Sequence, residues 1–117
     1  MQSFSPAMLE ACYDFLRETD PFHRWKLPDG ETIEFHVIRS NRFRGWHEFD
    51  GESHKVGISD RWHSHTSSIV ETMAHEMIHI RQAIIGTTTK NTQHNAAFHR
   101  IADRVCSIHG FDRKAFI

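Results

Sequence analysis

The chain has 117 residues, of which 38% are hydrophobic and 25% charged, and its formal net charge at pH 7 is −1. This length suits one globular domain, and the small net charge argues against a wholly basic nucleic-acid binder. The short apolar runs exclude a membrane-spanning helix, and the N-terminus lacks the pattern of a signal peptide. We therefore expect residues 1–117 to form a single domain of a cytoplasmic protein.

The first predicted element is a helix that starts after Ser5, because serine followed by proline is typical of a helix N-terminus. Apolar residues recur at helical spacing from there until about Thr19. Between Pro21 and Ser59 the pattern changes to the alternation that indicates strands. We expect three short antiparallel strands, with an exposed edge near Lys55–Ser59 that could bind an extended peptide.

Two further helices follow. The first has a capping box at Ser68 and Glu71, and it should end at Gly86. A polar loop leads to the last helix, whose apolar stripe includes Phe98 and which closes at Gly110. The elements predict an α+β fold: an N-terminal helix, a small three-stranded antiparallel sheet and two helices.

The stretch TMAHEMIHIRQ places His75 and His79 four residues apart in the first of these two helices. Residues at this spacing lie on one helix face, about 5–6 Å apart, so both imidazoles can bind one metal ion. Glu76 lies one position round the helix, where its carboxylate can act as general base without being a ligand. The alternative is an ordinary amphipathic helix with two titratable histidines and a solvated glutamate.

A catalytic zinc site usually has three protein ligands, so a third must come from elsewhere in the chain. Gln82 and Ile85 occupy the positions where a metzincin needs glycine and histidine, and no glutamate follows Glu76 to complete a thermolysin-type site. The two cysteines form no C-x-x-C pair, which excludes a cysteine zinc ribbon. The remaining candidates are His94, His99, His109, Asp103 and Asp112.

The combination of HEMIH with HNAAF, roughly within Gly45 to Gly110, resembles the SprT-like metalloproteases, a Spartan-related family. The resemblance implies a minimal zincin-like protease core with one Zn2+ per chain, and Glu76 as the catalytic base. The ligands that it implies are His75, His79 and His94. The best-known members cleave proteins bound or crosslinked to DNA, so the resemblance also implies a role in DNA–protein crosslink repair.

Helix geometry favours His94 over His99 as the third ligand. The loop GTTTKNTQ can extend to roughly 26 Å, which is enough to return the chain to the metal at His94. His94 would then lie in the first turn of the last helix, capped by Thr92, and His99 would point about 140° away. The residue that follows His94 is Asn95, at a position where the family usually has glycine.

Other polar residues have weaker signals. Four of them are candidates for stabilising a developing oxyanion: Tyr13, His63, His65 and Arg100. The histidines at positions 23, 36, 47, 54 and 109 have no spacing that suggests a site, and we expect surface or hydrogen-bonded roles for them.

The segment RSNRFRGWHEF interleaves basic and aromatic side chains. Basic groups can follow a phosphate backbone while aromatic rings stack on unpaired bases. Single-stranded DNA is therefore a candidate partner, bound through Arg39, Arg42, Arg44 and Trp46. The alternative is a solvated strand with one packed face.

The sequence thus predicts a zinc-dependent metallopeptidase that acts on a protein or peptide substrate and does not associate with a membrane. Two alternatives remain. One is a noncatalytic nucleic-acid-binding module in which zinc is structural. The other is an enzyme that acts on bonds other than peptide bonds.

Overall fold

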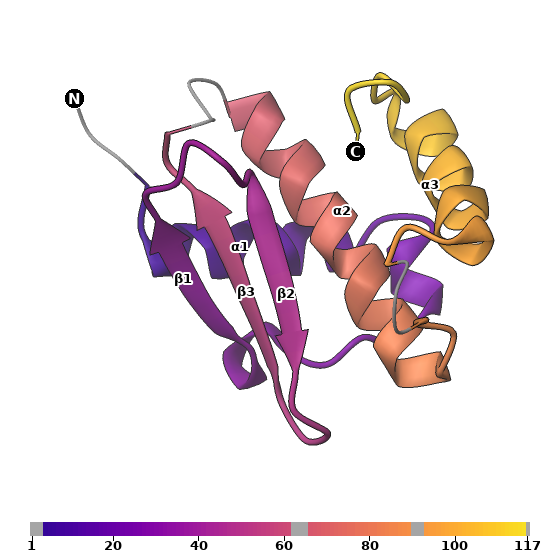
Figure 1. The fold of residues 1–117 in the computed structure, drawn as a ribbon, viewed down its shortest axis with the longest axis horizontal. Coiled ribbons are helices and arrows are strands. Elements are labelled where there is room, and N and C mark those ends of the chain that lie inside the picture. Colours follow the sequence, from indigo (N-terminus) through magenta and orange to yellow (C-terminus); the bar gives the residue numbers. More distant parts are fainter. Residues whose placement is uncertain (1–3, 62–65, 90–92, 117) are drawn as a thin grey trace.

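The computed structural model describes residues 4–61, 66–89 and 93–116, which fold into three α-helices and a small sheet (Figure 1). The helices are α1 (Pro6–Arg17), α2 (Thr66–Ile85) and α3 (Ala96–His109), and the strands are β1 (Glu34–Ile38), β2 (Gly45–Phe49) and β3 (His54–Ser59). Two short 3-10 turns, η1 (Phe22–Arg24) and η2 (Gly30–Thr32), connect α1 to β1. The predicted α+β class is confirmed. Over the described ranges no helix combines the length and the apolar character that crossing a membrane requires.

The sheet has the order β1-β3-β2, and its pairing corrects the expectation of a purely antiparallel sheet. β2 and β3 form an antiparallel hairpin, whereas β1 pairs with β3 in parallel, with Phe35 opposite Val56. The hairpin turn is held by Asp50, whose Oδ1 accepts hydrogen bonds from the backbone nitrogens of Glu52 and Ser53. Apolar alternation identifies a strand but not its partner or direction, so the sequence could not separate these pairings.

β3 is the central strand, so the prediction of an exposed edge at Lys55–Ser59 is wrong. β3 has a paired neighbour on each side, and all of its residues except Lys55 are buried. Within the described ranges the outer strands are β1 and β2. β2 is the strand that lies beside α2 (Figure 1).

The hydrophobic core lies between the sheet and the helices. α1 packs against β1 and α2, while α2 also contacts β2, β3 and α3, so α2 occupies the middle of the molecule (Figure 1). The largest fully buried apolar side chains come from every layer: Leu9, Tyr13, Leu16, Phe22, Val56, Ile58, Met73, Met77, Ile78, Ile80 and Phe98. This arrangement fixes α2 from several sides.

The ends of α1 and α3 are capped by short polar side chains. Oγ of Ser5 accepts a hydrogen bond from the backbone nitrogen of Met8 at 3.2 Å, as the sequence predicts. α3 is capped by Asn95 rather than by the expected Thr92, which lies outside the described residues. Gly110 ends α3 with a φ of 77°, the left-handed conformation that glycine adopts without strain.

α2 begins earlier than the sequence suggested. Its first residue is Thr66, so Ser68 lies inside the helix and the predicted capping box with Glu71 is wrong. The C-terminal end agrees with the prediction, because the helix stops at Ile85 and Gly86 follows with a φ of 75°. The added first turn leaves the HExxH residues in the helix interior.

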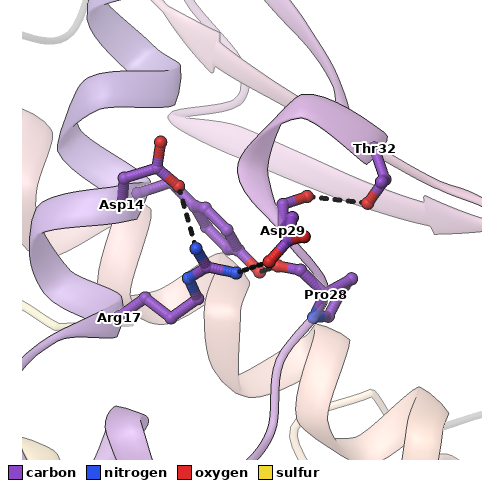
Figure 2. A network of polar contacts seen from close by, with 6 residues as sticks. Asp14, Arg17, Pro28, Asp29 and Thr32 are labelled. Carbon is purple, nitrogen blue, oxygen red and sulfur yellow. Dashed lines mark hydrogen bonds and ion pairs between the residues drawn. The ribbon is translucent and has the colours of Figure 1, made fainter.

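A polar network ties the segment before β1 to α1 (Figure 2). The hydroxyl of Tyr13 donates to the carbonyl oxygen of Pro28 at 2.6 Å, and Nη1 of Arg17 donates to Oδ1 of Asp29 at 2.7 Å. The hydroxyl of Thr32 donates to the Asp29 carbonyl oxygen at 2.7 Å, which closes the η2 turn. These contacts hold η2 against α1.

Candidate metal centre

α2 carries the HExxH residues between the sheet and α3. The apolar residues around the motif are completely buried: Met73, Ala74, Met77, Ile78 and Ile80. A helix packed in this way keeps its side-chain directions fixed, so His75 and His79, about one turn apart, project to the same side. His75 is itself only 8% exposed.

Three histidine side chains converge beside α2. Nε2 of His75 lies 3.1 Å from Nε2 of His94 and 3.3 Å from Nε2 of His79. One ring nitrogen from each histidine lies within 4.8 Å of the other two. In the described ranges no other set of three histidine, cysteine, aspartate or glutamate side chains converges in this way. A tetrahedral zinc ion with Zn–N bonds of about 2.1 Å spaces its ligands roughly 3.4 Å apart. The three nitrogens therefore fit a metal ion.

The third histidine comes from the segment that precedes α3. His94 lies two residues before the first residue of α3, so the expectation that it belongs to the first helical turn is wrong. Phe98 packs inward as predicted and is fully buried. Its ring stacks on the rings of His94 and His79, with centroid distances of 4.5 and 4.8 Å. Phe98 thus forms an apolar support beneath the histidines.

A backbone carbonyl group sets the tautomer of His75. Nδ1 of His75 lies 2.9 Å from the carbonyl oxygen of Phe116. A carbonyl oxygen can only accept, so Nδ1 donates its hydrogen and Nε2 presents its lone pair to the other two histidines. This is the arrangement that a metal-binding imidazole needs.

Burial keeps the histidines of the cluster uncharged. It lowers the pKa of His75 to about 4 and that of His79 to about 3, because the charged ring is poorly solvated. The pKa of His94 is also lowered, again chiefly by burial. Neutral imidazoles are the form that binds metal ions.

Glu76 lies next to this cluster and is 4% exposed. Burial raises the pKa of its carboxyl group to about 8. On β2, Gly45 leaves space for the carboxylate, since a Cβ atom at this position would lie 3.1 Å from Oε2 of Glu76. The same atom would lie 2.9 Å from the carbonyl oxygen of Gly57, closer than real Cβ contacts come. Glycine therefore allows β2 to approach the carboxylate closely.

An open cleft of about 1140 Å³ contains the histidines and Glu76. One wall consists of β2 and the residues just before it, and the other of α2. The segment around His94 and the residues Ala115 and Phe116 close the remaining side. The volume exceeds the range of about 300–1,000 Å³ that is usual for small-ligand pockets, and it suits an extended chain segment.

A further histidine, His47, lines the cleft and pairs with His54, and sequence reasoning missed its place there. His47 on β2 stacks nearly parallel to His79, with ring centroids 6.3 Å apart, and its Nε2 lies 2.8 Å from Nδ1 of His54. Burial, followed by repulsion from His54, lowers the pKa of His47 to about 4. The strand period could have found it, because positions 45, 47 and 49 share the face of β2 that lies against α2.

The other candidate ligands lie outside the cluster. Nη2 of Arg113 lies 2.7 Å from Nδ1 of His99, and Nε of Arg113 donates to Asp103 at 2.6 Å. Nε2 of His109 lies 2.7 Å from the carbonyl oxygen of Asp20, near the end of α1. Asp112 accepts a hydrogen bond from a backbone nitrogen two residues further on.

Two of the four candidates for oxyanion stabilisation, Tyr13 and Arg100, do not line the cleft in the described part of the chain. The hydroxyl of Tyr13 is engaged with Pro28, and Arg100 is exposed on α3. Neither is among the described residues that line the cleft. His63 and His65 lie outside the described ranges.

Much of the basic and aromatic segment lines the cleft. A Cβ atom at Gly57 would collide with the ring of Trp46, which therefore lies across the sheet face that points away from α2. Trp46 is nevertheless among the residues that line the cleft, as are Arg42 and Arg44. Nη1 of Arg44 donates to the carbonyl oxygen of Ala115 at 2.9 Å and so holds the chain beside the histidines.

A family model described as the SprT-like family matches residues 13–115. The match extends from α1 to the segment that follows α3, well beyond the part of the chain that carried the resemblance in the sequence. It includes all three histidines of the cluster and Glu76. No curated protein matches the chain.

Proposed function

This chain belongs to the SprT-like family, and on that premise we propose that it is a zinc-dependent metallopeptidase that hydrolyses peptide bonds. One observation carries the proposal: three imidazole nitrogens face one another at the side of α2, next to a buried carboxyl group. The proposal assigns His75, His79 and His94 as the ligands of one Zn2+ and Glu76 as the catalytic base. It treats residues 1–117 as one domain.

The donor set supports zinc. Three neutral imidazoles suit zinc and similar transition metals, whereas magnesium and calcium prefer oxygen ligands. A zinc ion held here would supply Lewis-acid chemistry, because zinc polarises a carbonyl oxygen and lowers the pKa of water.

The proposal assigns the proton transfer from the attacking water to Glu76. Its carboxylate would take a proton from the attacking water and deliver it to the nitrogen of the leaving amine. Burial alone favours the protonated carboxyl group, with a pKa of about 8. A positive charge on the neighbouring histidine cluster would favour the carboxylate and so prepare Glu76 to accept a proton.

The free edge of β2 supports a peptide substrate. Among the described residues β2 pairs only with β3, and its residues line the cleft beside α2. An extended peptide can bind such an edge through backbone hydrogen bonds, which would bring a peptide bond close to the histidines. This edge replaces the one expected at Lys55–Ser59. Proteins bound or crosslinked to DNA are the substrate class that the family resemblance supports.

The substitution Glu76→Gln tests this assignment. It removes the base and leaves the three histidines in place, so we expect peptide hydrolysis to fall by roughly 10²–10⁴-fold. Hydrolysis is measured on DNA-bound proteins, with and without the DNA, and on an unstructured protein. Zinc content, measured by elemental mass spectrometry, should stay at one ion per chain.

Glu71→Gln is the matched control, because Glu71 lies on the same helix and lines the same cleft. It removes the same charge and should retain most of the activity. A Glu76→Gln variant that loses its zinc, or that hydrolyses peptides like the parent, would contradict the role of Glu76. If the parent chain binds zinc but hydrolyses nothing, the noncatalytic zinc-binding alternative is favoured.

A further inference from the structure

The side chain of Asn95, the N-cap of α3, joins three segments of the chain. Its Oδ1 accepts hydrogen bonds from the backbone nitrogen of Phe98 at 2.9 Å and from Nε2 of Gln82 at 3.1 Å. Its Nδ2 donates to the carbonyl oxygen of Thr87 at 2.9 Å and to the hydroxyl of Thr89 at 3.3 Å. One amide thus connects α2, the segment after α2 and the first turn of α3.

Gln82 is fully buried on α2, three residues beyond His79. The backbone N–H of Phe98 can only donate, so Oδ1 of Asn95 must face it, and Gln82 can approach this oxygen only with its NH2 group. As a result, Oε1 of Gln82 is buried and has no hydrogen-bond partner in the described part of the chain. An apolar side chain would fill this space without an unsatisfied acceptor, so packing alone does not account for a glutamine here.

We propose that Gln82 and Asn95 are positioning residues that hold His94 at the metal centre. His79 and Gln82 belong to the same helix, and Asn95 directly follows His94, so the Gln82–Asn95 hydrogen bond sets the distance between the two parts of the cluster. The hydrogen bonds from Asn95 to Thr87 and Thr89 hold the residues just after α2 beside His94. A glycine at position 95 has no side chain to form any of these bonds.

The inference rests on the proposed metal site, and it adds to the three ligands a pair of residues that are not themselves ligands. Residues that orient metal ligands typically change metal affinity by about 10–100-fold when they are replaced. We therefore expect an effect on zinc affinity that is separate from any effect on folding.

Two substitutions test the pair. Asn95→Ala removes the four hydrogen bonds that its side chain forms with described residues, whereas Gln82→Met removes only the link to α2 and leaves the cap of α3 intact. Competition with a chelating dye gives the Kd for zinc. We expect Kd to rise by about 10–100-fold for Asn95→Ala and by a smaller factor for Gln82→Met. Circular dichroism and thermal unfolding confirm that each variant is folded.

Ser5→Ala is the matched control, because it removes the N-cap of α1, and no residue of α1 lines the cleft among those described. It should lower the unfolding temperature and leave Kd for zinc at the parent value. If Asn95→Ala and Gln82→Met bind zinc as tightly as the parent, the inference is overturned and the metal site stands. If Ser5→Ala weakens zinc binding equally, the effect is general destabilisation and the inference also fails. A parent chain that binds no zinc would overturn the proposed function instead.

Discussion

At the scale of single residues, metal binding depends on whether three imidazoles carry protons. A histidine in an unfolded chain protonates near pH 6.5. Burial lowers the pKa of His75 to about 4 and that of His79 to about 3, and it lowers the pKa of His94 as well. Protons therefore compete for the folded cluster only at a pH below the ordinary histidine range.

In the Glu76→Gln variant, which removes the cleft carboxyl group whose pKa is raised to about 8, zinc affinity should consequently change little between about pH 7.5 and about pH 6, measured as Kd at constant ionic strength. Three exposed histidines would lose roughly 50-fold over this range through protonation alone. The lowered pKa values also affect stability. As the pH falls below 6.5, these histidines bind protons in the unfolded chain but stay neutral in the folded chain. In the same variant, the contribution of these histidines to the free energy of unfolding of the zinc-free protein should be fully present above pH 6.5 and decline below it, whereas in the parent the raised pKa of Glu76 acts in the opposite direction. A steep loss of zinc affinity between pH 7 and pH 6 would contradict these assignments.

At the scale of elements, the cluster draws two ligands from one rigid helix and the third from the segment that precedes the next helix. His99 belongs to α3 proper, and its ring lies against Arg113 rather than in the cleft. His94 and His99 are close in sequence, but they belong to different surroundings. Of these two, His94 is the one that faces the histidines of α2.

The substitutions His94→Ala and His99→Ala separate these surroundings. We expect His94→Ala to lose most of its zinc in dialysis against a weak chelator, because two nitrogen ligands hold the ion poorly. His99→Ala should keep one zinc per chain and change the free energy of unfolding by less than about 1 kcal/mol, as exposed polar contacts do. The reverse result, with zinc lost only from His99→Ala, would overturn the ligand set.

Local signals predicted the elements well, because a helix cap or an apolar stripe depends on residues that are close in sequence. The cap at Ser5 and the stop at Gly86 are examples. The parallel pairing of β1 could not be predicted in this way, since it arises when β3 inserts between β1 and β2.

In the candidate site, too, the features set by local spacing were predictable and those set by tertiary packing were not. The spacing of His75 and His79 was visible in the sequence, whereas the place of His47 depends on how β2 packs against α2. The hydrogen-bond acceptor for His75 is the backbone carbonyl group of Phe116. Every residue has such a group, so no pattern of side chains in the sequence could predict it.

At the scale of the whole molecule, the two halves of the chain meet at several points, one of them at the cleft. Arg44, just before β2, donates to the carbonyl oxygen of Ala115, and Thr19 at the end of α1 lies within hydrogen-bond distance of His109. The basic residues near β2 are thus not equivalent. We propose that single-stranded DNA contacts this region, and Arg44 is a poor probe of that contact because it also holds the chain beside the histidines.

Arg39 and Arg42 are better probes, because the side chain of Arg39 is 74% exposed beside Asp60 and Arg42 is also exposed. Replacing both with alanine should weaken binding of a fluorescent single-stranded oligonucleotide. The magnitude of the slope of log K against log salt concentration should decrease by about 1.4, because each phosphate contact to a single strand contributes roughly 0.7 and two are removed. Arg100→Ala with Arg104→Ala on α3 is the control and should leave the slope unchanged. No detectable binding at low salt, or equal loss in both pairs, would remove the proposal.

The hydrogen bond between His75 and Phe116 has a consequence for biosynthesis. A ribosome releases the chain from its N-terminus, and Phe116 follows His75 by 41 residues. A nascent chain that has exposed α2 therefore presents the HExxH motif, which holds two of the three clustered histidines. It still lacks the carbonyl group that orients His75. His94 emerges next, and the orienting group comes later still. The centre is thus completed only after the helices that surround it have left the ribosome.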